Sequence, residues 1–290
     1  MDIDLKLDRV TISGGIYKHR TALTELNNAL SKSRWEQISD SEFRLLRKNE
    51  NGVYEHVAGL YANKFQNGSW RLDTSNHLQG DELQQILIPL NLMTCPHLTR
   101  IDVAFDIING DLPNMAHRIF KFGTSERIFG EGINEYTGRA KQIQTIYAGT
   151  RKSEMQIRYY DKAAEQKSRR KELPDGVKKW ERLEIQLRGK SIGEWKIACR
   201  KMLMTFKMPN YSTVKNAQER AMLAALQNHV VEYHELARAT RTKFRSLLKS
   251  NIGLDDTYSQ LLMVYFDEHV TDLENEIKGF FTKIGVNENK

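Results

Sequence analysis

The sequence predicts an α+β fold in which an antiparallel sheet carries helices on one face and the active site on the other. Three segments between residues 98 and 188 alternate apolar and polar side chains, which is the period of a half-buried strand. From residue 212 onward, the apolar residues recur at helical spacing instead. We therefore expect a domain over residues 1–206 that carries the active site, and a helical C-terminal region over residues 207–290.

Each element follows from a local pattern. Alternating residues predict strands, helical spacing predicts helices, Asn and Gly mark turns, and Pro113 opens a helix in its first turn. The expected order is strand Asp2–Ser13, helix Thr21–Leu30, strands Glu42–Arg47, Gly52–Leu60 and Ser69–Leu72, helix Asp81–Leu90, strand Leu98–Ile108, helix Pro113–Phe122, strands Gln142–Ala148 and Glu154–Tyr160, helix Ala163–Lys171, strand Trp180–Arg188, helix Ile192–Met204, and helical segments Ser212–Ser250 and Asp256–Lys283.

Positive charge is concentrated in the middle of the chain. Residues 138–190 hold 15 Lys+Arg against 7 Asp+Glu, a surplus of +8, whereas the whole chain carries +7. A run of charge is often only a solvated face. A surplus gathered around one motif instead favours a polyanionic partner, and nucleic acid is the first candidate.

The composition argues against several other classes of protein. With only Cys95 and Cys199, the chain has neither a disulfide framework nor a cysteine metal cluster. No apolar run is long enough to span a bilayer, and the first residues alternate like a strand rather than like a signal peptide. We expect a cytoplasmic protein.

Three of the predicted strands combine into one polar surface if they belong to one sheet, because side chains two residues apart share a face. Each strand keeps an apolar set for the opposite, core-facing side. The polar sets are Asp102 and Asp106 in the first strand, Gln156, Arg158 and Tyr160 in the second, and Arg182, Glu184, Gln186 and Arg188 in the third.

The carboxylates of this surface are candidate metal ligands. The outer face of an antiparallel sheet is polar in any case, but Asp is depleted from strands, so two aspartates on one face of one strand, Asp102 and Asp106 with only Ala104 between them, are unusual. Together with Glu184 they suit an oxygen-ligated Mg²⁺ or Mn²⁺. Such an ion would polarise a phosphate that is being cleaved.

The alternation separates two adjacent tyrosines. Tyr160 falls on the polar face with Arg158, and Tyr159 falls on the core side. A hydroxyl held among cations suits attack on a phosphodiester, and we expect those cations to lower the phenol pKa from about 10. The pattern favours Tyr160 as the nucleophile, although a bulge of one residue would exchange the two faces.

Three stretches of the chain resemble one known family. LTRIDVAFDI (98–107), YAGTRKSEMQIRYYDKAAEQ (147–166) and WERLEIQLR (180–188) are similar to the rolling-circle replication initiators of the pT181 plasmid type. The same family includes phage initiators and relaxases of some integrative conjugative elements. Its signature stands here as Gly149–Ser153, Arg158–Lys162 and Glu165.

The resemblance implies an origin-specific endonuclease of a bacterial host that nicks and rejoins DNA, forming a 5′-phosphotyrosine bond and freeing a 3′-OH. It also implies homodimerisation and contact with a host helicase. Position by position, the resemblance assigns nucleophilic attack to Tyr160, the scissile phosphate to Arg158 and Lys162, and a metal ion (Mg²⁺ or Mn²⁺) to Asp102, Asp106 and Glu184.

Further contacts with DNA are expected from basic residues outside this set. The loop Gly123–Arg139 and the basic helix at 238–249 are candidates for origin specificity, and His56 and His97 could assist. The candidate DNA-binding residues are Arg151, Lys152, Arg182, Arg188, Arg241, Lys243 and Arg245.

Two alternatives to a replication initiator remain open. A conjugative relaxase of the same family would share the chemistry, but such relaxases often carry a helix-turn-helix domain first, and the strand that begins at Asp2 leaves no room for one. A non-catalytic DNA-binding regulator would explain the basic charge equally well. It would gain nothing from carboxylates aligned with Tyr160, which therefore favour an enzyme.

Overall fold

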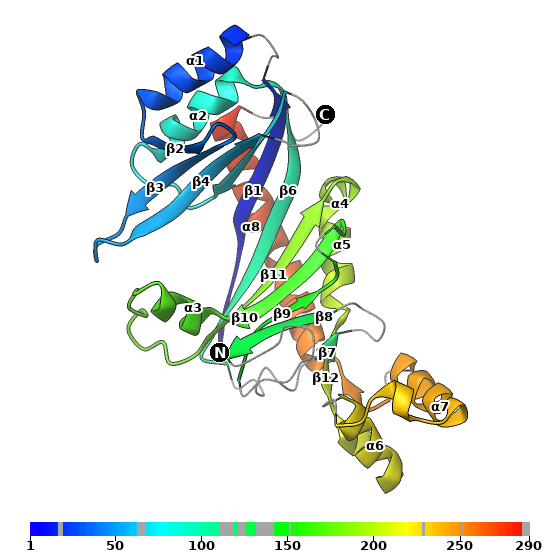
Figure 1. Ribbon diagram of the computed structural model, residues 1–290. Helices are drawn as coiled ribbons and strands as arrows, with labels where there is room; N and C mark the ends of the chain where they lie inside the picture. The colour runs from blue at the N-terminus through cyan, green and yellow to red at the C-terminus, as the bar shows by residue number, and fades with distance from the viewer. Residues whose placement is uncertain are drawn as a thin grey trace.

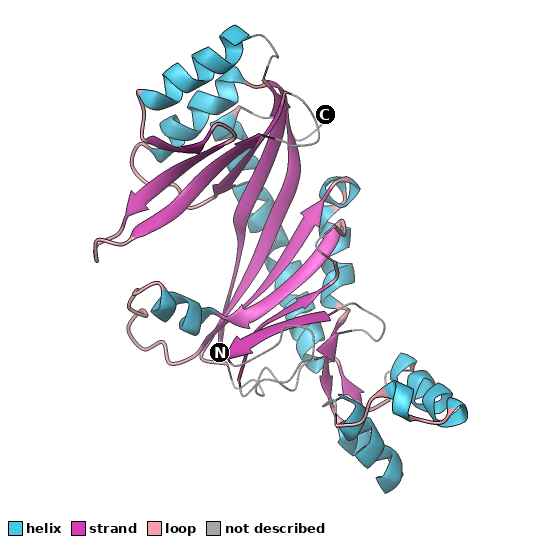
Figure 2. Ribbon diagram, viewed as in Figure 1, coloured by secondary structure: helices cyan, strands magenta, loops and turns pink. Residues whose placement is uncertain are grey.

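The computed structural model describes residues 1–16, 20–62, 68–110, 119–120, 126–131, 142–150, 152–227, 230–250 and 252–285. Its main feature is an antiparallel 10-stranded sheet with the order β2-β3-β4-β5-β1-β6-β11-β10-β9-β8 (Figures 1 and 2). The strands are β1 Asp2–Gly15, β2 Trp35–Ser39, β3 Glu42–Lys48, β4 Tyr54–Ala62, β5 Ser69–Ser75, β6 Thr94–Ile108, β8 Glu126–Glu131, β9 Gln142–Ala148, β10 Met155–Asp161 and β11 Trp180–Arg188.

The helices and a second, small sheet complete the fold. The small sheet pairs β13 (Leu254–Asp255), β12 (Phe206–Pro209) and β7 (Ile119–Phe120). Single 3₁₀ turns lie at Tyr211–Thr213 and Tyr233–Glu235. The helices are α1 Arg20–Ser31, α2 Glu82–Leu92, α3 Lys162–Ser168, α4 Lys190–Gly193, α5 Trp195–Leu203, α6 Ala217–Gln227, α7 Arg238–Lys249 and α8 Thr257–Ile284.

One face of the main sheet forms the hydrophobic core. The alternating apolar side chains of β6, β10 and β11 all point to it, as their period of two predicts. The long helix α8 runs along this face, with α5 and α2 beside it (Figure 1). Phe266 of α8 packs against Phe105 of β6 and meets Trp195 of α5 edge-on, with ring centroids 6.3 and 6.2 Å apart. The predicted α+β class, with helices on one face of an antiparallel sheet, is confirmed.

A bulge in β1 changes which residues face the core. β1 pairs with β6, and the register shifts between Leu7 and Arg9. Leu7 is buried before the shift and Val10 after it, so Asp8 and Arg9 both turn away from the core. Glu276 of α8 accepts a hydrogen bond from the Leu7 backbone N–H at 2.9 Å. The C-terminal helix thereby fixes the bulge.

Several elements differ from those that the sequence predicts. The strands β2 and β8 were not predicted from the sequence. The strand β2 is a short edge strand whose residues after Trp35 are exposed, so it lacks the alternation of a half-buried strand. The predicted helix Pro113–Phe122 is wrong at Ile119–Phe120, which pair as β7, and its residues 113–118 and 121–122 lie outside the described residues. The predicted helix Ile192–Met204 is divided into α4 and α5 at Glu194.

The C-terminal part of the chain contains two kinds of packing. Val214, Leu223, Leu226 and Phe244 form a small separate core beneath α6 and α7, which project from the end of the molecule beyond β12 (Figure 1). The residues of α8 instead belong to the main core. The segment from 211 to 254 is therefore the part of the helical region that packs by itself, and α8 completes the sheet domain. No helix in the described ranges is both long and apolar enough to cross a membrane.

Candidate functional site

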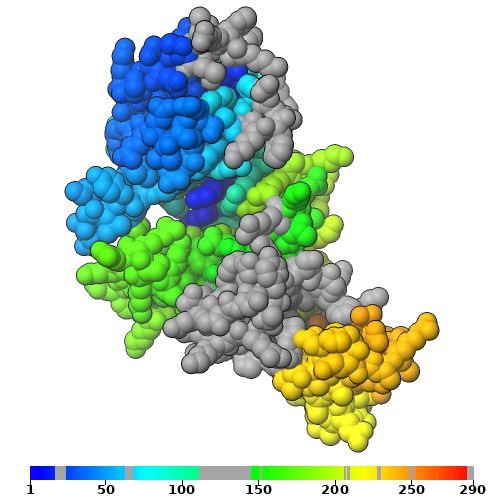
Figure 3. Space-filling view, in the orientation of Figure 1, coloured from blue at the N-terminus to red at the C-terminus, as the bar shows by residue number. Residues whose placement is uncertain are grey.

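A polar cleft lies on the face of the sheet opposite the core. It has a volume of about 330 Å³ and is lined by residues from β1, β3–β6, β10, β11 and α3. The hairpin of β3 and β4 reaches the segment after α3 across the cleft, where Lys171 pairs with Glu55 at 2.7 Å and Asn51 donates to the Arg170 carbonyl at 3.1 Å. Figure 3 shows these two segments, in light blue and green, facing each other. These contacts join the two walls of the cleft at this end.

The two adjacent tyrosines take opposite faces of β10. Tyr160 lines the cleft, whereas Tyr159 is fully buried in the core and donates a hydrogen bond to Glu181 at 2.6 Å. β10 pairs without a register shift with both of its neighbours, so the faces predicted from the alternation hold. The sequence-based expectation that Tyr160 is the tyrosine on the polar face is confirmed.

The hydroxyl of Tyr160 is bound to a carboxylate rather than to a cation. It donates a hydrogen bond to Glu184 Oε1 at 2.6 Å, and the side chain is only 3% exposed. Burial and the charge of Glu184 raise the pKa of Tyr160 above its ordinary value, and Arg182 and Arg158 oppose this only in part. Our expectation that cations lower this pKa is therefore wrong, because the alternation reveals neighbours but not burial.

Two predicted phosphate-binding cations flank Tyr160. The guanidinium of Arg158 lies 4.2 Å from the centre of the Tyr160 ring, and its Nη1 lies 3.3 Å from Glu184 Oε2. Its Nε is buried and has no hydrogen-bond acceptor among the described residues. Lys162 begins α3, lies 5.7 Å from the Tyr160 ring centre and pairs with Glu165. Burial and Arg182 lower the pKa of Lys162.

Glu184 is the buried carboxylate at the centre of this group. Burial raises the pKa of Glu184, and the positive charge of Arg158 opposes the shift. A carboxylate with a raised pKa accepts a proton more readily near neutral pH. The hydrogen bond from the Tyr160 hydroxyl to Glu184 therefore places a proton donor directly beside a group that can act as its base.

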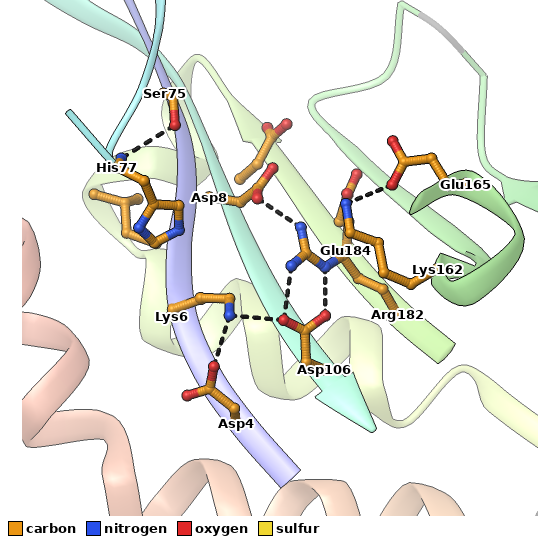
Figure 4. Close-up of polar contacts among 12 residues, drawn as sticks. Asp4, Lys6, Asp8, Ser75, His77, Asp106, Lys162, Glu165, Arg182 and Glu184 are labelled. Atoms are coloured by element: carbon orange, nitrogen blue, oxygen red, sulfur yellow. Dashed lines mark hydrogen bonds and ion pairs between the residues drawn. The ribbon is translucent and has the colours of Figure 1, made fainter. Parts of the chain in front are cut away.

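The predicted metal ligand Asp106 is held in an ion-paired network (Figure 4). Arg182 binds both of its oxygens, with Nε–Oδ1 at 2.5 Å and Nη2–Oδ2 at 2.7 Å, and Lys6 Nζ lies 2.7 Å from Oδ2. Arg182 also reaches Asp8 at 2.7 Å, on the bulge of β1. Burial opposes ionisation of Asp106, but Arg182 and Lys6 hold its pKa at about 2.

The other carboxylates predicted to hold a metal are also engaged by cations. Arg100 binds Asp102 through Nε at 2.7 Å and through Nη2, and Glu184 is held by Arg158 and Tyr160. No group of three or more His, Cys, Asp or Glu side chains in the described ranges is close enough to hold a metal ion. As they stand, these carboxylates share one face but do not fit a preformed divalent-cation site.

The predicted DNA-binding residues do not all gather at the cleft. Arg182 lines it but is committed to its two aspartates, and Lys152 is exposed near the start of β10. Burial and Arg100 lower the pKa of Arg188 at the far end of β11. Arg151, the loop Gly123–Arg139 except for the backbone of β8, and residues 113–118 lie outside the described residues.

Three further predicted DNA-binding residues lie on α7, apart from the cleft. Arg241 donates to the Leu236 carbonyl at 3.2 Å, and Lys243 pairs with Glu219 of α6 at 2.6 Å. Arg245 lies over the ring of Tyr233 at 5.4 Å. Arg241 and Arg245, four residues apart, share one side of α7, whereas Lys243 lies on another, so the three do not form one surface.

Of the two predicted assisting histidines, one reaches the cleft. His56 lines it from β4, and burial together with Arg9 and Arg44 lowers the pKa of His56. His97 is exposed, and its ring Nδ1 lies 3.0 Å from the Cys95 carbonyl oxygen. His97 is not part of the cleft wall.

Sequence reasoning missed the residues that β1 contributes to the site. Lys6, Asp8 and Arg9 line the cleft, and so does Arg100 of β6. The signal for the bulge was present, because two consecutive charged residues, Asp8 and Arg9, interrupt the alternation of the first strand. The ion pair that Asp8 makes with Arg182 across the sheet leaves no such local signal in the sequence.

Comparisons with known proteins agree with the motifs. Two replication initiation proteins from Staphylococcus aureus are 26% and 27% identical to this chain over 279 and 261 residues, which cover 94% and 88% of it and 83% and 78% of their own lengths. A solved rolling-circle replication initiator protein from Geobacillus stearothermophilus aligns with 86% of this chain and 97% of its own, at 14% identity and a TM-score of 0.39. The model of the replication initiation factor family matches residues 96–217, which span β6, β10, α3 and β11. The resemblance to replication initiators that the motifs predict is thereby confirmed, and it is carried by residues 96–217 for the family model and by most of the chain for the two relatives.

Proposed function

We propose that this protein initiates rolling-circle DNA replication by nicking one strand at a replication origin, with Tyr160 as the nucleophile. The observation that carries the proposal is the phenol of Tyr160, hydrogen-bonded to buried Glu184 in the wall of a cleft lined by cations. The match of residues 96–217 to replication initiation factors supports the biological role.

The proposed reaction exchanges one phosphoester bond for another. The Tyr160 Oη attacks the phosphorus of a backbone phosphodiester, and the Oη–P bond forms as the bond from phosphorus to the 3′ oxygen breaks. Glu184 accepts the phenol proton, for which its raised pKa prepares it. Lys162, whose pKa is lowered, donates a proton to the departing 3′ oxygen. The products are a 5′-phosphotyrosine link and a free 3′-OH.

Arg158 stabilises the charge that develops during this exchange. Its side chain is 37% exposed and lines the cleft, so guanidinium N–H groups that face the cleft can donate to a phosphate oxygen. A donor that is already oriented in a partly dry site stabilises a developing anion more than a donor in water does. Attack through a neutral, buried phenol also explains why the site needs a base in direct contact with it.

Metal dependence stays a prediction from the family resemblance. Because Asp102, Asp106 and Glu184 are each engaged by cations, no step of the proposed reaction is routed through an ion. The proposal also includes origin DNA as the partner in the cytoplasm of a bacterial host. A homodimer and contact with a helicase belong to the proposal without an assigned surface.

The test is a nicking assay on supercoiled DNA that carries the element's own origin. We expect the wild type to convert it to open circles, Tyr160→Phe to be inactive, and Tyr159→Phe, the matched control on the opposite face, to remain active. Parallel reactions with Mg²⁺, Mn²⁺ and EDTA test the predicted metal dependence. A wild type that binds this DNA without nicking it would instead support the non-catalytic regulator.

A further inference from the structure

The cleft extends well beyond Tyr160, to the bulge of β1 and the edges of β4 and β5. Arg9, His56 and His77 line this distant part. The backbone of Arg9 is paired in the sheet, but its side chain has no hydrogen bond or ion pair with any residue that the structure describes. Arg9 is partly buried in the wall of a polar cleft, where a cation without a partner favours an anionic ligand.

The other strong cations of the cleft are already balanced. Apart from Arg9, every described Lys or Arg in the wall of the cleft is paired with a carboxylate. These pairs are Lys6 with Asp4 and Asp106, Arg47 with Glu82, Arg100 with Asp102, Arg158 with Glu184, Lys162 and Arg169 with Glu165, Lys171 with Glu55, and Arg182 with Asp8 and Asp106. Arg9 is therefore the exception in the described wall.

The neighbours of Arg9 agree with a site for an anion. Burial is the main cause of the lowered pKa of His56, and the positive charges of Arg9 and Arg44 add to it while Asp73 and Glu42 oppose it, so His56 lies within electrostatic reach of Arg9. His56 and His77 line the same cleft and add ring nitrogens that can donate or accept hydrogen bonds. The bulge between Leu7 and Arg9 is what turns Arg9 toward the cleft instead of the core.

The strand registers locate Arg9 relative to the nucleophile. Tyr160 lies opposite Arg182, Arg182 opposite Asp106, and Arg9 opposite Asp102. From β10 to β1 there are three strand spacings, about 14 Å, and four residues along β6 add about 13 Å. The two sites are therefore about 20 Å apart along the face of the sheet, which is farther than one phosphate can reach.

We propose that Arg9, flanked by His56 and His77, binds a second phosphate of the same DNA single strand that Tyr160 attacks. The strand then crosses the sheet from β10 to β1 along the cleft, and Arg9 fixes a nucleotide remote from the scissile bond. This inference rests on the proposed function, because the ligand is the substrate strand. Arg9 acts in binding and not in the chemical step.

The experiment measures nicking kinetics on single-stranded oligonucleotides from the origin, shortened stepwise from either end. For Arg9→Gln we expect KM to rise about tenfold on the full-length substrate with kcat unchanged, since one charge-assisted phosphate contact is lost. When the substrate is shortened from one end until the phosphate that Arg9 binds is lost, the KM of the wild type should also rise about tenfold. On such short substrates the wild type and Arg9→Gln should have equal KM values. The slope of log KM against log salt concentration should be smaller by about 0.7 for Arg9→Gln than for the wild type, because one phosphate contact is lost.

The matched control is Arg200→Gln, which removes the same charge from the opposite, helical face, where Arg200 pairs with Asp267. Its KM should equal that of the wild type. Equal KM values for Arg9→Gln and wild type on every substrate would overturn the inference while the proposed function stands. A loss confined to kcat would overturn it as well. If the wild type nicks no origin substrate, both the proposed function and this inference fail.

Discussion

Replacing Asp106 by Asn tests whether this buried aspartate is held by an ion pair. Asp106 is only 1% exposed, receives two bonds from Arg182 and a third contact from Lys6, and lies on the central strand β6. Asn keeps the shape of the side chain but removes the negative charge. The two cations then remain at the cleft without their shared partner.

The magnitude follows from the pKa of Asp106. Arg182 and Lys6 hold it at about 2 against an ordinary value of 3.8, despite burial. A difference of about 1.8 units corresponds to about 2.4 kcal/mol of stability at neutral pH. Removing one partner of a buried pair costs about 3–5 kcal/mol in the cases that have been measured. We therefore expect Asp106→Asn to lower the free energy of unfolding by about 2 to 4 kcal/mol.

The pH dependence gives this prediction a second readout. Because the pKa of Asp106 is depressed in the folded protein, its contribution is present above about pH 4 and is lost as the pH falls toward about 2. The Asn variant has no such group, so its deficit should shrink over this range. Urea unfolding followed by tryptophan fluorescence at pH 7 and at pH 3 measures both. Equal unfolding free energies for the variant and the wild type at pH 7 would refute the ion-pair account of this residue.

Three further variants separate the roles of other side chains. Glu184→Gln should slow nicking by about 10² to 10⁴-fold and remove the rise in rate as pH increases through the Glu184 pKa; an unchanged pH profile would exclude it as the base. Tyr159→Phe loses its bond to Glu181 and should cost about 1 kcal/mol in thermal unfolding while nicking persists, so an inactive but stable variant would contradict the assignment of faces. Glu276→Gln weakens the clamp on the bulge and should lower urea stability by about 1 kcal/mol, and no change would show that the bulge holds without it.

Local alternation was sufficient to predict one part of the site. Side chains in β6, β10 and β11 follow a strict period of two, and these strands pair with one another without register shifts. The shared face of Asp102, Arg158 and Tyr160 could therefore be predicted from the sequence alone. The boundaries of β11 were predicted to the residue for the same reason.

The rest depends on contacts between distant segments. The bulge at Asp8 is stabilised by Glu276, which is 269 residues from Leu7 in the chain. Ion pairing of Asp106 with Lys6 and Arg182 likewise joins three separate strands. The pKa of Tyr160 depends on its burial, which no single strand reveals.

The most direct test of the account is to identify the residue that becomes joined to DNA. Wild-type protein would be incubated with the origin strand, digested with protease and nuclease, and its peptides analysed by mass spectrometry. The account predicts a nucleotide phosphate on the peptide that contains β10, with fragment ions that assign it to Tyr160 and its loss in Tyr160→Phe. A modification on Tyr159 or on any other residue, or nicked DNA without a covalent peptide, would contradict it.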